Sequence, residues 1–208
     1  HAFGGSVFDE AGKPAFDSTA QLDAARFARS LHKEHGITPK GMTGFMVTSH
    51  FNDKKAVAVL NGPWFRAEIK GVDYGVVPIP SVAGKTPKPF LGVEALFVSS
   101  KSELKRHAVK LAEFIAGPEG AAIRLDKGKQ VVAHKATLAQ GAKGDPVLET
   151  FRLQANAAEL MPSTPEMQLV WATADQAITG VVFGDKEPEA AFKKAQVKVV
   201  DDLSKRGK

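Results

Sequence analysis

The sequence predicts an α/β fold, with strands and helices mixed along the chain and helices dominant towards the C-terminus. Two observations lead to this prediction. Short continuous apolar runs bounded by Gly or Pro are typical of strands in a buried sheet, and they lie at 56–60, 72–80 and 90–98. Apolar residues at helical spacing form longer segments, at 17–36, 102–116, 146–159 and 188–203, and in a helix that follows the Pro-punctuated entry beginning at 161 and continues to 184.

Composition limits the class of protein. With 208 residues the chain can form one large domain or two small ones, and 43% hydrophobic with 25% charged residues is ordinary for a globular chain. No apolar run reaches the roughly 20 residues that span a bilayer, and the absence of Cys excludes disulfides and thiolate chemistry. The chain begins with neither an initiator Met nor a signal-peptide pattern, so we expect a processed protein or a piece of a longer one.

The net charge of +5 permits attraction to nucleic acid or anionic membranes. However, the cations alternate with acids, as in 101–106, and this pattern is typical of solvated helix faces. We therefore expect no nucleic-acid partner.

The N-terminal elements begin with a hairpin at 3–16, whose turn needs the positive φ that Gly12 supplies. Capping residues at 17–19 then start a helix that ends at Gly36. A weaker helical pattern covers 42–52.

In the middle of the chain, Asn-Gly-Pro at 61–63 stops the first predicted strand, and a Gly- and Pro-rich loop covers 81–89. The run 90–98 contains a Gly and a lone Glu, which indicates a strand that passes between environments. Ser100 or Ser102 is expected to cap the helix that ends at 116. The next helix opens at Pro118 and reaches 126, and a linker follows at 141–145.

The two Trp residues each follow a break in the chain. Trp64 comes directly after Gly62 and Pro63, and Trp171 ends the Pro-punctuated stretch that begins at Met161. Large aromatic side chains are mostly buried, so composition alone favours two core residues. Their matching positions after breaks favour recognition aromatics at the rim of a cleft. Both interpretations stay open at this point.

Catalytic and cofactor signatures are absent from the sequence: it has no Gly-rich nucleotide loop, no Gly-x-Ser-x-Gly and no His-Glu-x-x-His. His32 and His35 could share a helix face but have no third ligand nearby, so a solvated helix end explains them better than a metal. A glycosidase would need two carboxylates across a cleft, which no pattern singles out. We expect no enzyme, no metal and no cofactor.

Aromatic surface beside polar loops suits a carbohydrate. A sugar ring presents an apolar C–H face, which an exposed Trp can cover, and an edge of hydroxyls for polar groups. Trp64 and Trp171 fit this role best, and Tyr74 and Phe45 are weaker candidates.

Several segments resemble one known family. They are Asn61–Trp64, Val72–Val76, Lys88–Val93, Leu111–Phe114, Gly117–Gly120 and, most specifically, Met161–Met167 leading into Trp171. The chain resembles the periplasmic maltose/maltodextrin-binding proteins, the solute receptors of sugar ABC transporters. The resemblance covers essentially the whole chain but only about the second half of a complete receptor.

The resemblance implies a periplasmic-binding-protein type fold, with sugar held between two α/β lobes. Most of the C-terminal lobe would be 1–95 and 144–208, part of the N-terminal lobe would be 96–143, and hinge crossings would lie near 90–98 and 136–146.

By the same resemblance, Trp64 and Trp171 stack on sugar rings and Met161 lines the pocket. Three positions depart from the family pattern. Ala172 replaces a second aromatic, Asp175 stands where a cation reaches the sugar, and Gly44 stands where an aromatic is expected, beside Phe45. We therefore expect a maltose- or maltodextrin-like oligosaccharide, with the sugar and its length left open.

The expected function is that of a carbohydrate-binding receptor of an ABC importer, present as a fragment or shortened form. Its partners would be the sugar and a membrane permease, and its location would be periplasmic or extracellular. The alternative is a lobe that associates with itself or with a partner that supplies the missing lobe, and that binds little sugar alone.

Overall fold

A computed structural model describes residues 1–82 and 84–206, so residue 83 of the predicted loop at 81–89 lies outside the described residues. Packing divides the chain into two units, each assembled from separate stretches of the sequence. Unit 1 comprises His1–Met42, Ser81–Phe90 and Glu159–Lys208, and unit 2 comprises Thr43–Pro80 and Leu91–Ala158.

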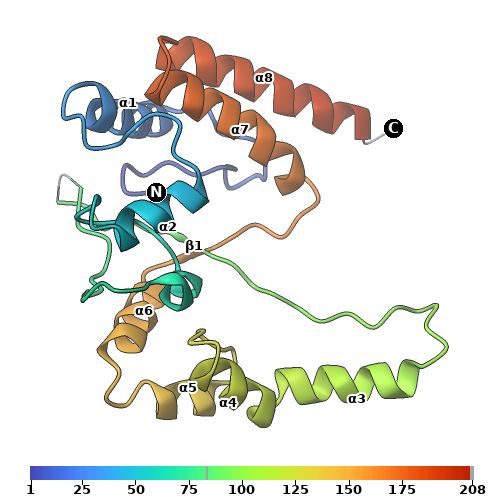
Figure 1. The fold of residues 1–208 in the computed structure, drawn as a ribbon. Coiled ribbons are helices and arrows are strands. Elements are labelled where there is room, and N and C mark those ends of the chain that lie inside the picture. The colour runs from blue at the N-terminus through green and yellow to red at the C-terminus, as the bar shows by residue number, and fades with distance from the viewer. Residues whose placement is uncertain (83, 207–208) are drawn as a thin grey trace. The chain divides into compact units, whose positions relative to one another are not determined.

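Unit 1 is built on three helices that pack against one another, α1 (Thr19–Lys33), α7 (Met167–Val182) and α8 (Pro188–Arg206), as Figure 1 shows. The hydroxyl of Ser18 caps α1, because it accepts a hydrogen bond from the N–H of Gln21. The apolar sides of the helices meet in one core, whose fully buried side chains include Val170, Val181 and Val199.

The predicted hairpin at 3–16 is a turn with one isolated bridge between Phe8 and Pro14, instead of two paired strands. Gly12 adopts a φ of +74°, as the predicted turn requires. The amide of Gln196 in α8 accepts a hydrogen bond from the N–H of Phe16 and donates one to the carbonyl of Pro14. The turn is therefore held against the helical core, where Phe16 is buried.

Unit 2 contains five α-helices and one 3₁₀ helix among its described residues: α2 (Gly44–Asn52), η1 (Pro63–Glu68), α3 (Lys105–Ala116), α4 (Pro118–Asp126), α5 (Lys135–Gly141) and α6 (Pro146–Asn156). Helix α4 packs against both α3 and α5 (Figure 1). The predicted start at Pro118 is confirmed, and the side chain of Asp145 caps α6. Phe65, Ala121 and Leu148 are buried in this unit.

Two predicted strands were wrong, because 56–60 and 72–80 form neither strand nor helix. The third, 90–98, is reduced to β1 (Phe90–Leu91), which pairs with β2 (Glu159–Leu160) in a two-stranded sheet. A strand persists where a neighbouring segment satisfies its backbone N–H and C=O groups. Within the described residues no such neighbour lies beside 56–60 or 72–80, and the fold is mostly helical with a small sheet.

Side chains of α6 replace part of the missing pairing. The amide oxygen of Gln154 accepts a hydrogen bond from the N–H of Ile79, and the hydroxyl of Thr150 lies 3.4 Å from the carbonyl of Val76. These contacts hold the backbone at 76–79. Several apolar side chains of the two segments stay in solvent, since Val57, Leu60 and Val77 are 103%, 79% and 74% exposed.

The predicted cap of the helix at 105–116 was also wrong. Helix α3 starts after Leu104, with no side-chain cap, and the hydroxyl of Ser102 instead accepts a hydrogen bond from the N–H of Leu104 within the preceding turn. Helix η1 and helix α5 were not predicted, because six or seven residues are too few to show a helical period. No described helix is both long and apolar enough to cross a membrane.

Candidate functional site

Trp64 lies near the start of η1 and projects into solvent, with 63% of its surface exposed. A 3₁₀ helix has about three residues per turn, so consecutive side chains leave it in directions about 120° apart. Phe65 points inward and is only 5% exposed, while Arg66 reaches towards α6. The burial of Phe65 therefore fixes the backbone from which Trp64 projects.

The lack of a side chain at Gly62 leaves space for the Trp64 ring. A Cβ atom built on Gly62 would lie 2.2 Å from Cη2 and 2.3 Å from Cζ3 of Trp64, far inside van der Waals contact. The backbone of Gly62, with φ −100° and ψ 178°, is accessible to any residue. The indole therefore requires glycine for space and not for backbone conformation.

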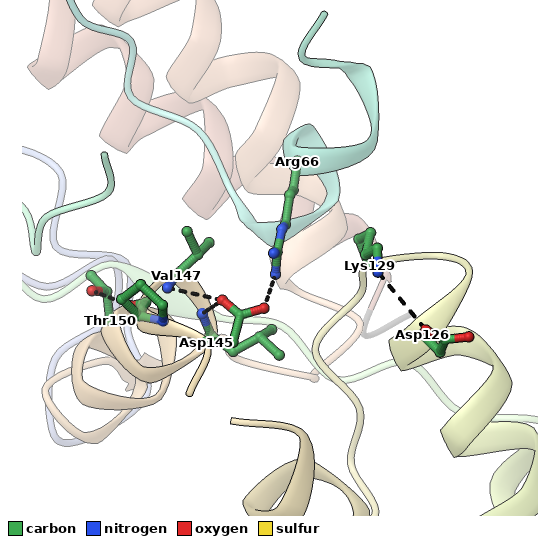
Figure 2. A network of polar contacts seen from close by, with 8 residues as sticks. Arg66, Asp126, Lys129, Asp145, Val147 and Thr150 are labelled. Carbon is green, nitrogen blue, oxygen red and sulfur yellow. Dashed lines mark hydrogen bonds and ion pairs between the residues drawn. The ribbon is translucent and has the colours of Figure 1, made fainter. Parts of the chain in front are cut away.

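Arg66 and Asp145 form the main polar contact of this part of unit 2, shown in Figure 2. Nη1 of Arg66 lies 2.7 Å from Oδ2 of Asp145, and the two side chains are only 20% and 25% exposed. Oδ1 of Asp145 accepts hydrogen bonds from the N–H groups of Val147 and Leu148 at the start of α6. One carboxylate thus caps a helix and binds a guanidinium with different oxygens.

The pKa of Asp145 reflects this environment. Partial burial alone would raise the pKa of the carboxyl. The hydrogen bond and charge of Arg66, together with the two backbone N–H groups, outweigh burial and lower the pKa below its ordinary value. The carboxylate is therefore held in its charged form at neutral pH.

Trp171 and Asp175 lie one turn apart on the exposed side of α7. Trp171 is 48% exposed, whereas the preceding residue, Val170, is 2% exposed and belongs to the core of unit 1. Ile178 is also exposed on this helix. The surface of α7 thus offers an aromatic face beside a carboxylate, which can cover a ring and accept hydrogen bonds from hydroxyls.

The other three predicted site residues have different surroundings. Met161 is half-buried and packs against the core of unit 1. Phe45, in the first turn of α2, is 82% exposed, and Tyr74 is half-buried in the segment at 72–80. Met161 therefore shares unit 1 with Trp171 and Asp175, while Phe45 and Tyr74 share unit 2 with Trp64. The sugar-binding roles of all six stay predictions.

Sequence reasoning missed Gly62, Phe65, Arg66 and Asp145 as parts of this site. One signal was present, since Asp directly before Pro146 is a typical helix start. Nothing in the sequence links Arg66 to a carboxylate 79 residues away.

Other features of the described residues offer no competing site. No group of three or more His, Cys, Asp or Glu could hold a metal within 1–82 and 84–206. His32 lies 2.6 Å from the carbonyl of Thr38 and contacts the ring of Phe183 edge-on, which gives it a structural role. A shallow hollow along α8 is lined by Ala190, Lys193, Lys194, Val197, Lys198 and Asp201, none of them a predicted site residue.

Replacing Gly62 by Ala is expected to displace the Trp64 indole, because the added methyl group occupies the position of the ring. In a Trp171→Phe background, where Trp64 is the only Trp, its emission maximum and anisotropy should both change. The free energy of unfolding should change by no more than about 1 kcal/mol, since the backbone accepts Ala. Gly75→Ala is the control, because a Cβ there meets nothing within 4 Å. An unchanged Trp64 spectrum in the Gly62 variant would contradict the packing described.

Acidification should remove the stability that the Asp145 carboxylate contributes. Because its folded-state pKa is lowered, this contribution is fully present above the ordinary pKa of 3.8 and is lost as the pH falls through the lower folded value. Asp145→Asn keeps an oxygen for the helix cap but cannot ionise. It should be less stable than the parent at neutral pH, and the difference should vanish in acid. Urea unfolding followed by Trp64 fluorescence at each pH measures the free energies of unfolding of the parent and the variant. A difference between them that did not vary with pH would refute the assignment.

The family model for bacterial extracellular solute-binding proteins matches residues 1–122, which is more than half of the chain. A galactooligosaccharide-binding protein of Bacillus subtilis is 28% identical over 93% of this chain and 49% of its own length. A maltooligosaccharide ABC transporter solute-binding lipoprotein of Streptococcus pneumoniae is 24% identical, over 98% of this chain and 50% of its own length.

A solved structure shows the same fold. The maltose/maltodextrin-binding domain from Bdellovibrio bacteriovorus, bound to maltotriose, matches with a TM-score of 0.86 and 26% identity, over 98% of this chain and 55% of that one. The chain spans about half the length of the curated relatives it matches. The predicted resemblance and the periplasmic-binding-protein type of fold are both confirmed. This chain belongs to the bacterial extracellular solute-binding proteins.

Proposed function

We propose that the chain is part of an oligosaccharide receptor of an ABC importer, and that Trp64 and Trp171 stack on sugar rings. One observation carries the proposal: both Trp side chains are largely exposed, at 63% and 48%, although each follows or precedes a buried residue. Large aromatics usually enter the core, and exposure of both leaves two apolar platforms for a ligand with an apolar face.

The class of ligand follows from the same surfaces. Sugar rings offer C–H faces to the two indoles, and hydroxyls to carboxylates such as Asp175. The relatives named above bind galacto- and malto-oligosaccharides, and this range supports an oligosaccharide without fixing which one. The departures from the family pattern at Gly44, Ala172 and Asp175 leave the identity of the sugar and its chain length open.

The proposal keeps the lobe assignment expected from the sequence, in which 1–95 and 144–208 would supply most of one lobe and 96–143 part of the other. A complete receptor would close two lobes on the sugar and deliver it to a membrane permease, on the periplasmic or extracellular side. This chain alone supplies only some of the contacts. It should therefore bind sugar weakly, with a Kd of about 1 mM or higher.

Binding, rather than catalysis, is the proposed activity. The named relatives are solute-binding proteins.

Titration with maltotriose, and separately with a galacto-oligosaccharide, tests the proposal through Trp fluorescence and heat. We expect at least one of them to change both signals at millimolar concentration. Trp64→Ala and Trp171→Ala should each weaken the Kd by about two- to tenfold, the amount that an aromatic contact is worth. Phe97→Ala is the control, because Phe97 is 91% exposed and belongs to no proposed platform. No response to either sugar would refute a retained binding site.

A second candidate function rests on exposed apolar side chains in the segments that lack strand partners. Val57 and Leu60, Val77, and Val93 with Phe97 are each more than 70% exposed. Helix α3 adds Leu111 at 59% and has no buried residue. Such surface is characteristic of an interface. The chain would then associate with a second copy, or with a polypeptide that supplies the missing lobe, and bind little sugar alone.

The association proposal predicts a mass that rises with concentration in light scattering. Phe97→Asp should reduce this rise, because a charge at an apolar interface is costly to desolvate. Ile37→Asp is the matched control, since Ile37 is also exposed, at 65%, but lies in unit 1. A clean monomer at every concentration would refute association with a second copy and leave only a partner that supplies the missing lobe.

A further inference from the structure

The C-terminal end of α2 contacts η1 and the residues that follow it. The rings of Phe51 and Phe65 lie 5.9 Å apart. The amide of Asn52 donates to the carbonyl of Glu68 and accepts a hydrogen bond from the N–H of Lys70. These contacts hold residues 65–70 on the side of α2, and Phe65, which directly follows Trp64, is the residue among them nearest to the indole in sequence.

Hydrogen bonds within η1 add little support to the start of this helix. Gly62 precedes it and offers no side-chain cap, and the N–H of Phe65 bonds the carbonyl of Gly62 at 3.1 Å. Pro63 supplies no N–H at all. A 3₁₀ helix of six residues has poor hydrogen-bond geometry of its own, so its orientation depends on contacts made by its side chains.

Arg66 provides such a contact on the side of α6. Its guanidinium points at the carboxylate of Asp145 in Figure 2, and its Nη1 atom lies 2.7 Å from Oδ2. The pair is charge-assisted and three-quarters or more buried, so solvent screens it less than an exposed pair. Arg66 is two residues beyond Trp64, within one turn of the same short helix.

Asp145 is itself held rigidly. Its Oδ1 atom lies 3.0 Å and 3.1 Å from the N–H groups of Val147 and Leu148, and Leu148 is buried at 4% exposure. A carboxylate bound by the first N–H groups of a helix has little freedom to rotate. The free oxygen is therefore presented to Arg66 in a fixed direction.

We infer that Arg66 and Asp145 are positioning residues for Trp64: the ion pair anchors η1 to the start of α6 and thereby fixes the direction of the indole. The pair acts on Trp64 through the backbone of η1, without contact with a ligand. Any contribution of this ion pair to sugar affinity rests on the proposed function of Trp64. The effect of the ion pair on the orientation of the indole does not rest on that function.

The experiment uses the full chain in a Trp171→Phe background, so that all emission comes from Trp64. Arg66→Met removes the charge at similar length, and Asp145→Asn removes the charge while keeping a capping oxygen. We expect each variant to lower the anisotropy of native Trp64, and the double variant to lower it no further than either single one, because both remove the same contact. Arg66→Lys should restore part of the signal.

Arg152→Met is the matched control. This variant removes the ion pair between Arg152 and Glu149 on α6. The pair is close, at 2.6 Å, but it is exposed and neither residue belongs to η1. Its native Trp64 anisotropy should equal that of the parent. If Arg66→Met and Asp145→Asn lower only the unfolding midpoint and leave native anisotropy unchanged, the pair is merely stabilising and the inference is overturned.

Titration of the variants with maltotriose separates this inference from the proposed function. In a chain that binds maltotriose, Arg66→Met should weaken the Kd by about two- to tenfold, the amount that ordering one large side chain is worth. If no sugar binds but the anisotropy changes as expected, the proposed function fails and the positioning role stands. If sugar binds with unchanged Kd and unchanged anisotropy in the variants, the positioning role fails alone.

Discussion

The burial of one apolar residue beside each Trp is the contact on which the candidate site depends. Phe65 enters the core of unit 2 and Val170 enters the core of unit 1, and each fixes the backbone of the adjacent Trp. In both helices the angular step between neighbours then turns the indole away from the core. Exposure of the two aromatics is thus a consequence of core packing and not of a loose surface.

The helices could be predicted largely from local signals. Ser18, Asp145 and Pro118 start helices where the sequence places a cap or a first-turn proline, and the apolar side of α7 follows its helical period. The strands could not be predicted in this way. A run such as 56–60 has strand composition, but a strand also needs a second segment to bond its backbone, and local composition does not contain that information.

In the candidate site, too, local sequence patterns predict some features, and others depend on residues far apart in the sequence. Trp64 and Trp171 stand out in the sequence because each follows a chain break, and the structure exposes both. The residues that hold Trp64 do not stand out. Gly62 reads as an ordinary turn glycine, although it is needed for ring packing, and the partner of Arg66 is 79 residues away. Local patterns predict which side chain is displayed, while the contacts that orient it come from tertiary structure.

Under the proposed function, the orientation of the indole carries unusual weight, because the chain spans about half the length of its relatives. A ligand enclosed on all sides is oriented by many contacts, and loss of order in one side chain is then a small part of the whole. A ligand held by one or two exposed platforms has no such redundancy, so the entropy of ordering each platform is a large fraction of a small binding free energy. An indole that Phe65, Gly62 and the Arg66–Asp145 pair already fix loses its side-chain entropy during folding, so less entropy is lost when a ligand binds. Under the proposed function, the anchoring of Trp64 therefore matters most where few other groups contact the sugar.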